Sequence, residues 1–496
     1  MRSSERVTRN VSLAMLGNVF SRACFLVVGI AAARYLGAEL FGVYSFAMFF
    51  SFLFATLSDG GLTVIMTREI ARDSERAETY LGNILFIKLA LVLFSLALLS
   101  VTVAFMDLSD LKLQAVYLAV GANLIYFYGM SAIGVFRAFE RMENEWVVLV
   151  LQGLSLLLLV LAAIFLDAGL LVILGAVLAS YSLMTAAAWF LVGNRFVRPQ
   201  LRFDASLCNY LAREAAPVGI SLVLFMSYNR IGTIALEVLR DSSQVGLYNA
   251  AFSLTRNLAV VPMAFAGAIL PTLSQLAVCG KGGLPQTYAR AFKLMLIITL
   301  PLAVGGALLA EPIVQLIYGA EFTGAGIALQ IVIWSLLFLS LSLVTRTVLE
   351  ASNRQVSWTY ALAAGVVVSL VLNVALIPRL GILGSSVALL AADIVIFGLA
   401  FYAVSRHLTL PVTAMTTAGL KVLASGVLMG IVVYLLGGVN IFLLVFIGAA
   451  VYGFSLLLFR ALGPEELTLI KGALRPWKRF RRHAGPNGVT SEGRES

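Results

Sequence analysis

Long runs of apolar residues recur along the chain from residue 11 to residue 459, and only short polar segments separate them. A helix needs about 20 apolar residues to cross a bilayer, and the runs reach that length. The run 154–166 is apolar on every face, whereas a strand of a membrane barrel alternates apolar and polar residues. We therefore predict an all-α polytopic membrane protein. The expected spans are 11–33, 41–63, 81–105, 113–135, 146–166, 168–192, 214–238, 245–271, 289–309, 325–349, 358–377, 382–404, 415–437 and 441–459.

The composition leaves no room for a folded soluble domain. Of the 496 residues, 60% are hydrophobic and 12% are charged, which is about half the charged fraction of a typical soluble protein. Fourteen spans use about 300 residues and leave about 13 residues for each loop or tail. These proportions exclude a soluble enzyme and a disulfide-stapled secreted domain.

The basic residues are distributed unevenly between the two sets of loops. One set contains four of the 35 Lys and Arg residues, and the opposite set, with the two tails, contains most of the others. Loops rich in Lys and Arg face the cytoplasm. We therefore expect an even number of spans in the cell (inner) membrane and two cytoplasmic termini, with twelve spans as the alternative to fourteen. The run 11–33 is longer than the apolar region of a cleaved signal peptide, so we expect a retained first helix.

Two short motifs occur twice, in the same order. Residues 41–47 match 245–251, and residues 138–141 match 351–354. A six-helix unit starts and ends on one side of the membrane, so its copies are related by a pseudo-two-fold axis along the membrane normal, and such transporters bind substrate between the halves. The expected divisions are an N-terminal six-helix lobe at 1–205, a C-terminal six-helix lobe at 206–410, an additional transmembrane hairpin at 411–460, and a basic cytoplasmic tail at 461–496 that is partly disordered.

The tail, the cysteines and the histidines indicate no catalytic chemistry. Basic and aromatic residues alternate at 475–482, and beside a last membrane helix this pattern favours contact with anionic lipids over RNA binding. The three Cys and two His are spaced for neither a disulfide framework nor a metal site. We expect no catalytic residue, no metal and no nucleic-acid partner.

Ionisable residues at membrane depth are the strongest indication of function. Each costs roughly 2.5–3.5 kcal/mol at the bilayer centre, so it usually faces a cavity or a partner. Arg22 and Arg256 lie about midway along their spans, and Arg230 lies about two-thirds across its span. The residues expected to contact substrate are Arg22, Arg230, Arg256, Asn18, Asn249, Lys88 and Arg346. For each arginine the alternative is a structural side chain that binds a carbonyl group or pairs with an acid.

Two acids also lie at membrane depth. Asp59 is toward the cytoplasmic end of its span, and Asp393 is near the middle of its own. Either one could carry a coupling proton or sodium ion, but pairing with an arginine is the favoured interpretation. Because cations outnumber acids, we expect a positive cavity and a negatively charged ligand. Arginine suits phosphate, since its planar guanidinium donates two hydrogen bonds at once.

A series of motifs along the chain carries a family resemblance. They are Ser-Asp-Gly-Gly-Leu at 58–62, then 67–72, 136–142, 228–230, 245–251, 270–274, 311–312, 318–322, Asn373 and 377–384. In their order and in the number of spans, they resemble the polysaccharide (O-antigen type) flippases of the multidrug/oligosaccharidyl-lipid/polysaccharide exporter superfamily.

The resemblance implies two six-helix lobes in a V that move a polyprenyl-pyrophosphate-linked oligosaccharide to the outer leaflet by alternating access. It implies that Arg22 and Arg256 meet the pyrophosphate. Asn229 stands where relatives often have Asp, which removes one acid that could couple an ion. The implied partners are the lipid-linked oligosaccharide, membrane lipids, and the polymerases or glycosyltransferases that act on the same lipid. A proton or sodium gradient can assist, and no other cofactor is expected.

Three other functions are compatible with parts of the pattern. A multidrug exporter of the same superfamily carries organic cations, which would favour acids over arginines in the cavity. A lipid II flippase would also use a cationic cavity. A membrane glycosyltransferase or ligase would need carboxylates on a substantial outer loop, and the longest one here, 310–324, contains only Glu311 and Glu321.

Overall fold

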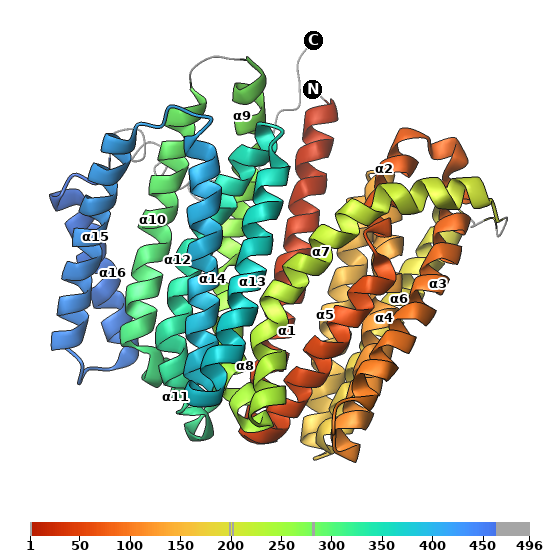
Figure 1. Ribbon diagram of the computed structural model, residues 1–496, viewed down its shortest axis with the longest axis horizontal. Helices are drawn as coiled ribbons and strands as arrows, with labels where there is room; N and C mark the ends of the chain where they lie inside the picture. The colour runs from red at the N-terminus through yellow and green to blue at the C-terminus, as the bar shows by residue number, and fades with distance from the viewer. Residues whose placement is uncertain (1, 198–199, 201–202, 280–282, 463–496) are drawn as a thin grey trace, which may run out of the picture.

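The computed structural model describes residues 2–197, 200, 203–279 and 283–462. All elements in these residues are helices (Figure 1). The first half contains α1 (Arg2–Asp59), α2 (Leu62–Arg72), η1 (Ser74–Arg76), α3 (Ala77–Ala104), α4 (Asp110–Ala138), α5 (Met142–Phe165) and α6 (Gly169–Arg195). The second half contains α7 (Ala205–Leu239), α8 (Ser242–Leu258), α9 (Val260–Cys279), α10 (Leu284–Leu308), α11 (Ala310–Tyr318), η2 (Ala320–Phe322), α12 (Ala325–Ala351), α13 (Gln355–Leu380) and α14 (Ile382–Ser405). The last two helices are α15 (Val412–Leu435) and α16 (Ile441–Leu458).

The helices account for the fourteen expected spans. Within the described residues, 12 helical segments are long and apolar enough to cross a membrane. The first of these contains a break at Gly37, where φ is 72° and ψ is 176°, so α1 forms two antiparallel arms. Helices α8 and α9, which only Ala259 separates, cover the expected span 245–271. The chain is a multi-pass membrane protein, and most of the expected tail 461–496 lies outside the described residues.

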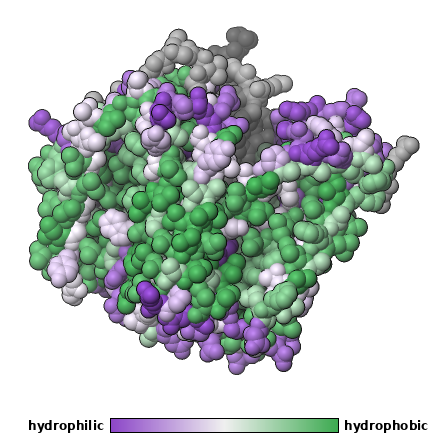
Figure 2. Space-filling view, in the orientation of Figure 1, coloured by the Kyte–Doolittle hydropathy of each residue, from purple (hydrophilic) through white to green (hydrophobic). Residues whose placement is uncertain are grey.

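The surface agrees with a bilayer environment. On the face shown in Figure 2, apolar residues form a broad band across the middle of the molecule, and polar residues gather at its two ends. The two polar ends of the molecule contain different elements. The near end contains the start of α1, together with α2 and the start of α7, and the far end contains Gly37, the start of α8 and α11 (Figure 1).

The two segments with the repeated 138–141 and 351–354 motif have the same backbone conformation, a helix ending that also follows α5 and α16. The turn after α4 and the turn after α12 each place their third residue, Glu140 and Asn353, in the left-handed region, with φ of 56° and 55°. In both turns the next residue's N–H bonds a carbonyl five residues back, from Arg141 to Phe136 and from Arg354 to Leu349. The two halves therefore share one helix-ending motif, as the matched sequences predict.

The other repeated motif forms the contact between the halves at the far end. A Cβ at Gly42 would lie 1.6 Å from the Ser242 carbonyl oxygen, and a Cβ at Gly246 would lie 2.0 Å from the Ala38 carbonyl oxygen. The two contacts are reciprocal, as a two-fold axis requires. The second arm of α1 therefore crosses α8 at a distance that only glycine permits. This crossing confirms the expected pseudo-two-fold relation.

Helix α7 runs obliquely from the first half at the near end to the second half at the far end (Figure 1). Asp204 caps its start by accepting hydrogen bonds from the backbone N–H groups of Leu207 and Ser206. These bonds favour the carboxylate and hold the pKa of Asp204 below its usual range. A little further along, Glu214 accepts a 2.7 Å bond from Arg68 of α2. The first part of α7 is thus held to the first half of the chain.

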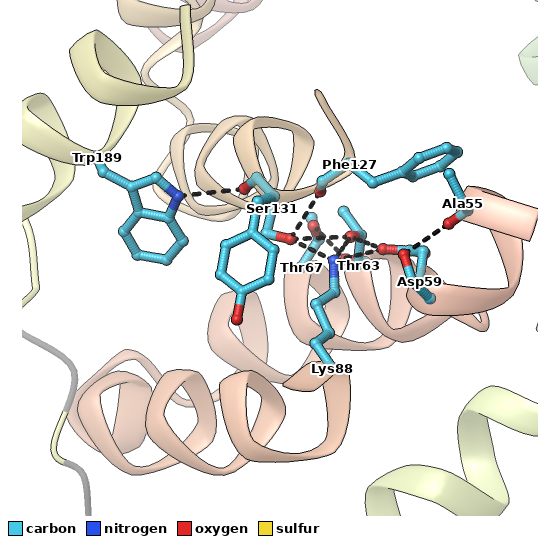
Figure 3. Close-up of polar contacts among 10 residues, drawn as sticks. Ala55, Asp59, Thr63, Thr67, Lys88, Phe127, Ser131 and Trp189 are labelled. Carbon is cyan, nitrogen blue, oxygen red and sulfur yellow. Dashed lines mark hydrogen bonds and ion pairs between the residues drawn. The ribbon is translucent and has the colours of Figure 1, made fainter. Parts of the chain in front are cut away.

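A buried ion pair joins the first four helices (Figure 3). The Lys88 ammonium on α3 donates to the Asp59 carboxylate at 2.5 Å, to the Thr63 hydroxyl at 3.0 Å and to the Ser131 hydroxyl. Thr63 also donates to Asp59. The Lys88 and Asp59 side chains are only 2% and 8% exposed. Because all three ammonium protons have acceptors, this cluster is electrically and geometrically complete.

We expect Gly42→Ala to destabilise the crossing by about 1–3 kcal/mol, the usual cost of inserting atoms into a well-packed contact. Thermal unfolding of the purified protein in detergent measures the loss. Gly175→Ala is the matched control, because a Cβ at Gly175 has no neighbour within 4 Å and alanine is the better helix former. Equal losses in both variants would mean that the crossing is not the cause.

We expect Lys88→Met to lower the free energy of unfolding by about 3–5 kcal/mol, because it leaves the Asp59 carboxylate buried without its cation. The double variant Asp59→Asn/Lys88→Met removes both charges and should recover most of that loss. Unfolding in detergent and the amount of protein in the membrane report both effects. A single variant as stable as the unaltered protein would contradict a structural role for the pair.

Candidate functional site

A cavity of about 320 Å³ lies between the two halves. Both arms of α1 line it, together with α4, α6, α7, α8 and α11. Its polar lining residues are Ser45, Asn123, Arg230, Asn249, Ser253 and Asn257, and its aromatic lining residues are Phe25, Phe41, Tyr44, Phe49, Phe52, Tyr126, Tyr181 and Tyr318. The structure thus brings the polar faces of the fourth, seventh and eighth expected spans to one place.

Arg230 is the cation in the wall of this cavity. Its guanidinium carbon lies 3.6 Å from the centroid of the Phe49 ring, so the charged plane stacks on the aromatic face. Its Nε atom is buried without a hydrogen-bond partner, and among the described residues Arg230 forms no ion pair. A cation at membrane depth without a carboxylate beside it is costly. Arg230 is therefore suited to receive an anion from a ligand.

Arg256 differs from Arg230 because an acid lies beside it. Its Nη2 atom is 3.8 Å from Asp393 Oδ2, and the Asp393 side chain is 2% exposed. The Tyr228 hydroxyl donates a hydrogen bond to the other carboxylate oxygen of Asp393. The Arg256 guanidinium also lies 5.1 Å from the Phe252 ring centroid. Pairing, the favoured interpretation of Asp393, describes this geometry. The pair is not hydrogen-bonded, and Arg256 Nε, Arg256 Nη2 and Asp393 Oδ2 are buried without hydrogen-bond partners.

Arg22 and Asn18 lie on the near-end side of the cavity. Arg22 is three and four residues before Phe25 and Leu26, which line the cavity, so it shares their face of α1. The Arg22 side chain is exposed, and no ion pair to it occurs among the described residues. Asn18 is one further turn toward the near end. Together these residues lie at the approach to the cavity rather than in its wall.

The amide side chains of the wall mainly hold helices together. Asn249 donates to the Val245 carbonyl and accepts a 2.9 Å bond from Thr233 on α7. Asn123 on α4 donates to the Met48 carbonyl and to Ser51 on α1. These bonds fix the cavity wall and leave the amides few free hydrogen-bonding positions.

Three other expected site residues lie away from the cavity. Lys88 and Asp59 belong to the buried cluster of the first half, so Lys88 points inward rather than toward the membrane surface. Arg346 bonds Glu350 at 2.6 Å one turn along α12, and its side chain is 41% exposed. Its guanidinium also lies 5.7 Å from the Trp358 ring centroid. The structure does not bring these three residues together with Arg230.

The aromatic lining is the feature that sequence reasoning missed. Phe41, Tyr44, Phe49 and Phe52 follow one another at helical spacing in an apolar span, where such a stripe is equally typical of a lipid-facing side. Aromatic faces pack against sugar rings and against cations alike. In the sequence, the tyrosines among these aromatic residues could have indicated a polar cavity, since a buried Tyr hydroxyl needs a polar partner.

The charges at membrane depth nearly balance. Asp59 neutralises Lys88 and Asp393 neutralises Arg256, which leaves Arg22 and Arg230 uncompensated among the described residues. No group of His, Cys, Asp and Glu in those residues could hold a metal ion. The cavity therefore has aromatic walls and one lining cation, Arg230, that no described carboxylate pairs with.

Comparisons with known proteins place this architecture in a family. A family model described as "Polysaccharide biosynthesis protein" matches residues 7–277, more than half of the chain, and the MatE model matches residues 217–375. The chain is 26% identical over 243 residues to the probable flippase AglR of Haloferax volcanii, covering 47% of this chain and 50% of that relative. It therefore matches about half the length of AglR.

Two further comparisons cover more of the molecule. The chain is 24% identical over 368 residues to the probable low-salt glycan biosynthesis flippase Agl15 of Haloferax volcanii, covering 72% of this chain and 74% of that relative. The solved structure of the lipid II flippase MurJ in an inward closed conformation superposes with a TM-score of 0.75 at 16% identity, over 90% of this chain and 99% of that one. This likeness confirms the expected exporter-superfamily fold. By the extent of the family match, the chain belongs to the polysaccharide biosynthesis protein family.

Proposed function

We propose that this chain is a flippase that moves a polyprenyl-pyrophosphate-linked oligosaccharide from the cytoplasmic to the outer leaflet. The observation that carries the proposal is the cavity between the halves, where Arg230 stacks on Phe49 without a carboxylate partner. A pyrophosphate supplies the missing anion, and the aromatic walls suit the faces of sugar rings. The family membership and the name of Agl15 support a glycan substrate, and the names of both relatives support flippase activity.

The far end of the molecule is closed in this state, which supports alternating access. Besides the glycine crossing, Arg34 of α1 donates to the carbonyl oxygens of Ile317 and Leu316 at 2.7 and 2.5 Å. Lys112 of α4 pairs with Glu237 of α7 at 2.5 Å. We refer to these bonds of Arg34 and Lys112 as the far-end clasps. We propose that the far end faces the outside of the cell and that the near end, with both termini, faces the cytoplasm.

Ion coupling is not required by this arrangement. Asp59 and Asp393 are both engaged with cations, and Asn229 bonds its own helix at the Phe225 carbonyl. The membrane potential can supply energy to the cycle instead, since it acts on each charge that crosses the membrane with about 2.3 kcal/mol per 100 mV. We propose no catalytic step, and we propose that polymerases and glycosyltransferases act on the lipid before and after transport.

Two other substrates remain for the assay to separate. The MatE family match and the aromatic walls favour an organic cation, while the fold of MurJ favours lipid II. Arg230 argues against the cation, because two positive charges would share one cavity. Lipid II shares the pyrophosphate and differs in its headgroup, so it is tested as a separate substrate.

We expect Arg230→Ala to slow transport about tenfold or more, because a hydrogen bond to a charged group contributes about 1.5–3 kcal/mol. The measurement is the leaflet of a polyprenyl-pyrophosphate oligosaccharide in proteoliposomes, with and without an imposed potential. Arg379→Ala is the control, since Arg379 is exposed at the far end. Arg256→Ala should lower both transport and stability, because it leaves the buried Asp393 carboxylate without its neighbouring cation. Unchanged transport in Arg230→Ala, or uptake of an organic cation instead, would overturn the proposal.

We expect Arg34→Met/Lys112→Met to shift the equilibrium toward a state open at the far end about tenfold, since two hydrogen-bonded contacts are lost. A Ser45→Cys substitution in the cavity, in a chain whose native cysteines are replaced by serine, reports opening through its labelling by a membrane-impermeant thiol reagent added outside cells. Arg379→Met at the same end is the control. Labelling that does not increase in the double variant would mean that the far-end clasps do not hold this end shut.

A further inference from the structure

A groove of about 430 Å³ lies on the surface of the first half, beside α7 and separate from the central cavity. Its walls are the last turn of α1, the start of α2, the middle of α3 and the first half of α7. The lining residues are Leu57, Gly60, Leu62, Ile87, Leu91, Ala212, Ala215, Ala216, Gly219, Ile220, Val223 and Leu224. Every one is apolar, so the groove suits a hydrocarbon chain and no polar ligand.

The groove exists because α7 crosses the break between α1 and α2 at backbone distance. A Cβ at Gly219 would lie 2.4 Å from the Gly60 carbonyl oxygen, and a Cβ at Gly61 would lie 2.7 Å from the Gly219 nitrogen. Beyond this crossing the small side chains of Ala212 and Ala216 leave space between the helices. Ile220 at the edge is 61% exposed, so the groove opens toward the surrounding lipid.

The groove and the central cavity follow one another along a single interface between α1 and α7. On α7, Arg230 is seven residues from Val223 and eleven from Gly219, so all three share one face of the helix. On α1, Phe49 and the groove residue Leu57 are eight residues apart and lie along one stripe of the helix. Arg230 stacks on Phe49 at one end of this interface, and the groove begins about 10 Å further along α7.

We infer that the groove binds the phosphate-proximal part of the prenyl chain while the phosphate of the same lipid contacts Arg230. The inference rests on the proposed function and adds the route of the tail. A lipid whose headgroup enters a polar cavity must keep its hydrocarbon chain out of water. From Ala212 to Leu224 the groove extends about 18 Å along α7, more than half of a ~30 Å hydrocarbon core.

The position of Arg230 in line with the groove favours the transported lipid over a bulk phospholipid as the occupant. A bulk phospholipid keeps its headgroup at the membrane surface, so its phosphate would lie far from Arg230. The prenyl-linked substrate has its phosphate directly at the end of its chain, which matches a cation that lies about 10 Å beyond the groove along the same face of α7. Removing one methylene group of the prenyl chain from the groove should weaken binding of the lipid about fourfold.

The test is photo-crosslinking of a polyprenyl pyrophosphate with a diazirine on its first isoprene units, in proteoliposomes of the full-length protein, followed by peptide mapping. We expect crosslinks on 212–224 and 57–62. Ala216→Trp fills the groove and should reduce crosslinking about tenfold. Leu420→Trp is the matched control, in a second apolar groove between α10, α14 and α15. The thermal stability of both variants must equal that of the unaltered protein.

Two further arms separate failure of this inference from failure of the proposed function. A water-soluble oligosaccharide pyrophosphate without a prenyl chain should bind Ala216→Trp with unchanged affinity and should bind Arg230→Ala about tenfold more weakly. If this probe binds but the diazirine crosslinks elsewhere, the groove is not the tail site. If a diazirine phosphatidylglycerol labels the groove and the polyprenyl lipid does not compete, the occupant is bulk lipid and the inference is wrong. If neither headgroup probe nor polyprenyl lipid binds, the proposed function fails first.

Discussion

The cost of charge in a low-dielectric interior is the constraint on which this structure depends. Each half of the molecule buries one carboxylate at membrane depth, and each carboxylate has a cation beside it: Lys88 with Asp59, and Arg256 with Asp393. A buried pair of this kind contributes little net stability, but breaking it is expensive. The pairs therefore lock helix positions within each half. Among the described residues Arg230, between the halves, has no such partner, and this asymmetry is the basis for proposing that its charge serves a ligand.

The second constraint is the approach of backbones without side chains between them. Gly42 and Gly246 cross on the pseudo-two-fold axis at the far end, and Gly60 and Gly219 cross near the opposite end. In a membrane, where apolar side chains gain nothing by leaving lipid, close backbone packing supplies much of the helix association. Because both crossings involve the second arm of α1, a movement of this arm relative to α7 and α8 would change both ends together. The geometry thus links closure at the far end to the groove and the cavity.

The sequence predicted the parts of this structure that follow from local pattern. Apolar run length gave the spans, and the repeated turn at 138–141 and 351–354 appeared as two left-handed residues, Glu140 and Asn353. Asn249, one of the polar residues singled out on its span, lines the cavity. Pattern could not show which cation has a partner, because Asp393 meets Arg256 only through the packing of α14 against α7 and α8. The same limit hid the role of Phe49, whose side depends on helix rotation rather than on residue type.

The count of unpaired cations decides how voltage acts on the transport cycle that we propose. A pyrophosphate diester carries about two negative charges. Arg230 in the cavity wall and Arg22 at the approach to the cavity together carry two positive ones, and we propose that both meet the substrate. The loaded cavity is then close to neutral, so its outward movement is nearly independent of the potential. The empty cavity returns inward with two positive charges, which the potential favours by about 4–5 kcal/mol at 100 mV. If Arg256 were also unpaired, the loaded cavity would be positive and the same potential would oppose its outward step. Neutralisation of Arg256 by Asp393 therefore places the voltage dependence on the return step without opposing delivery of the substrate.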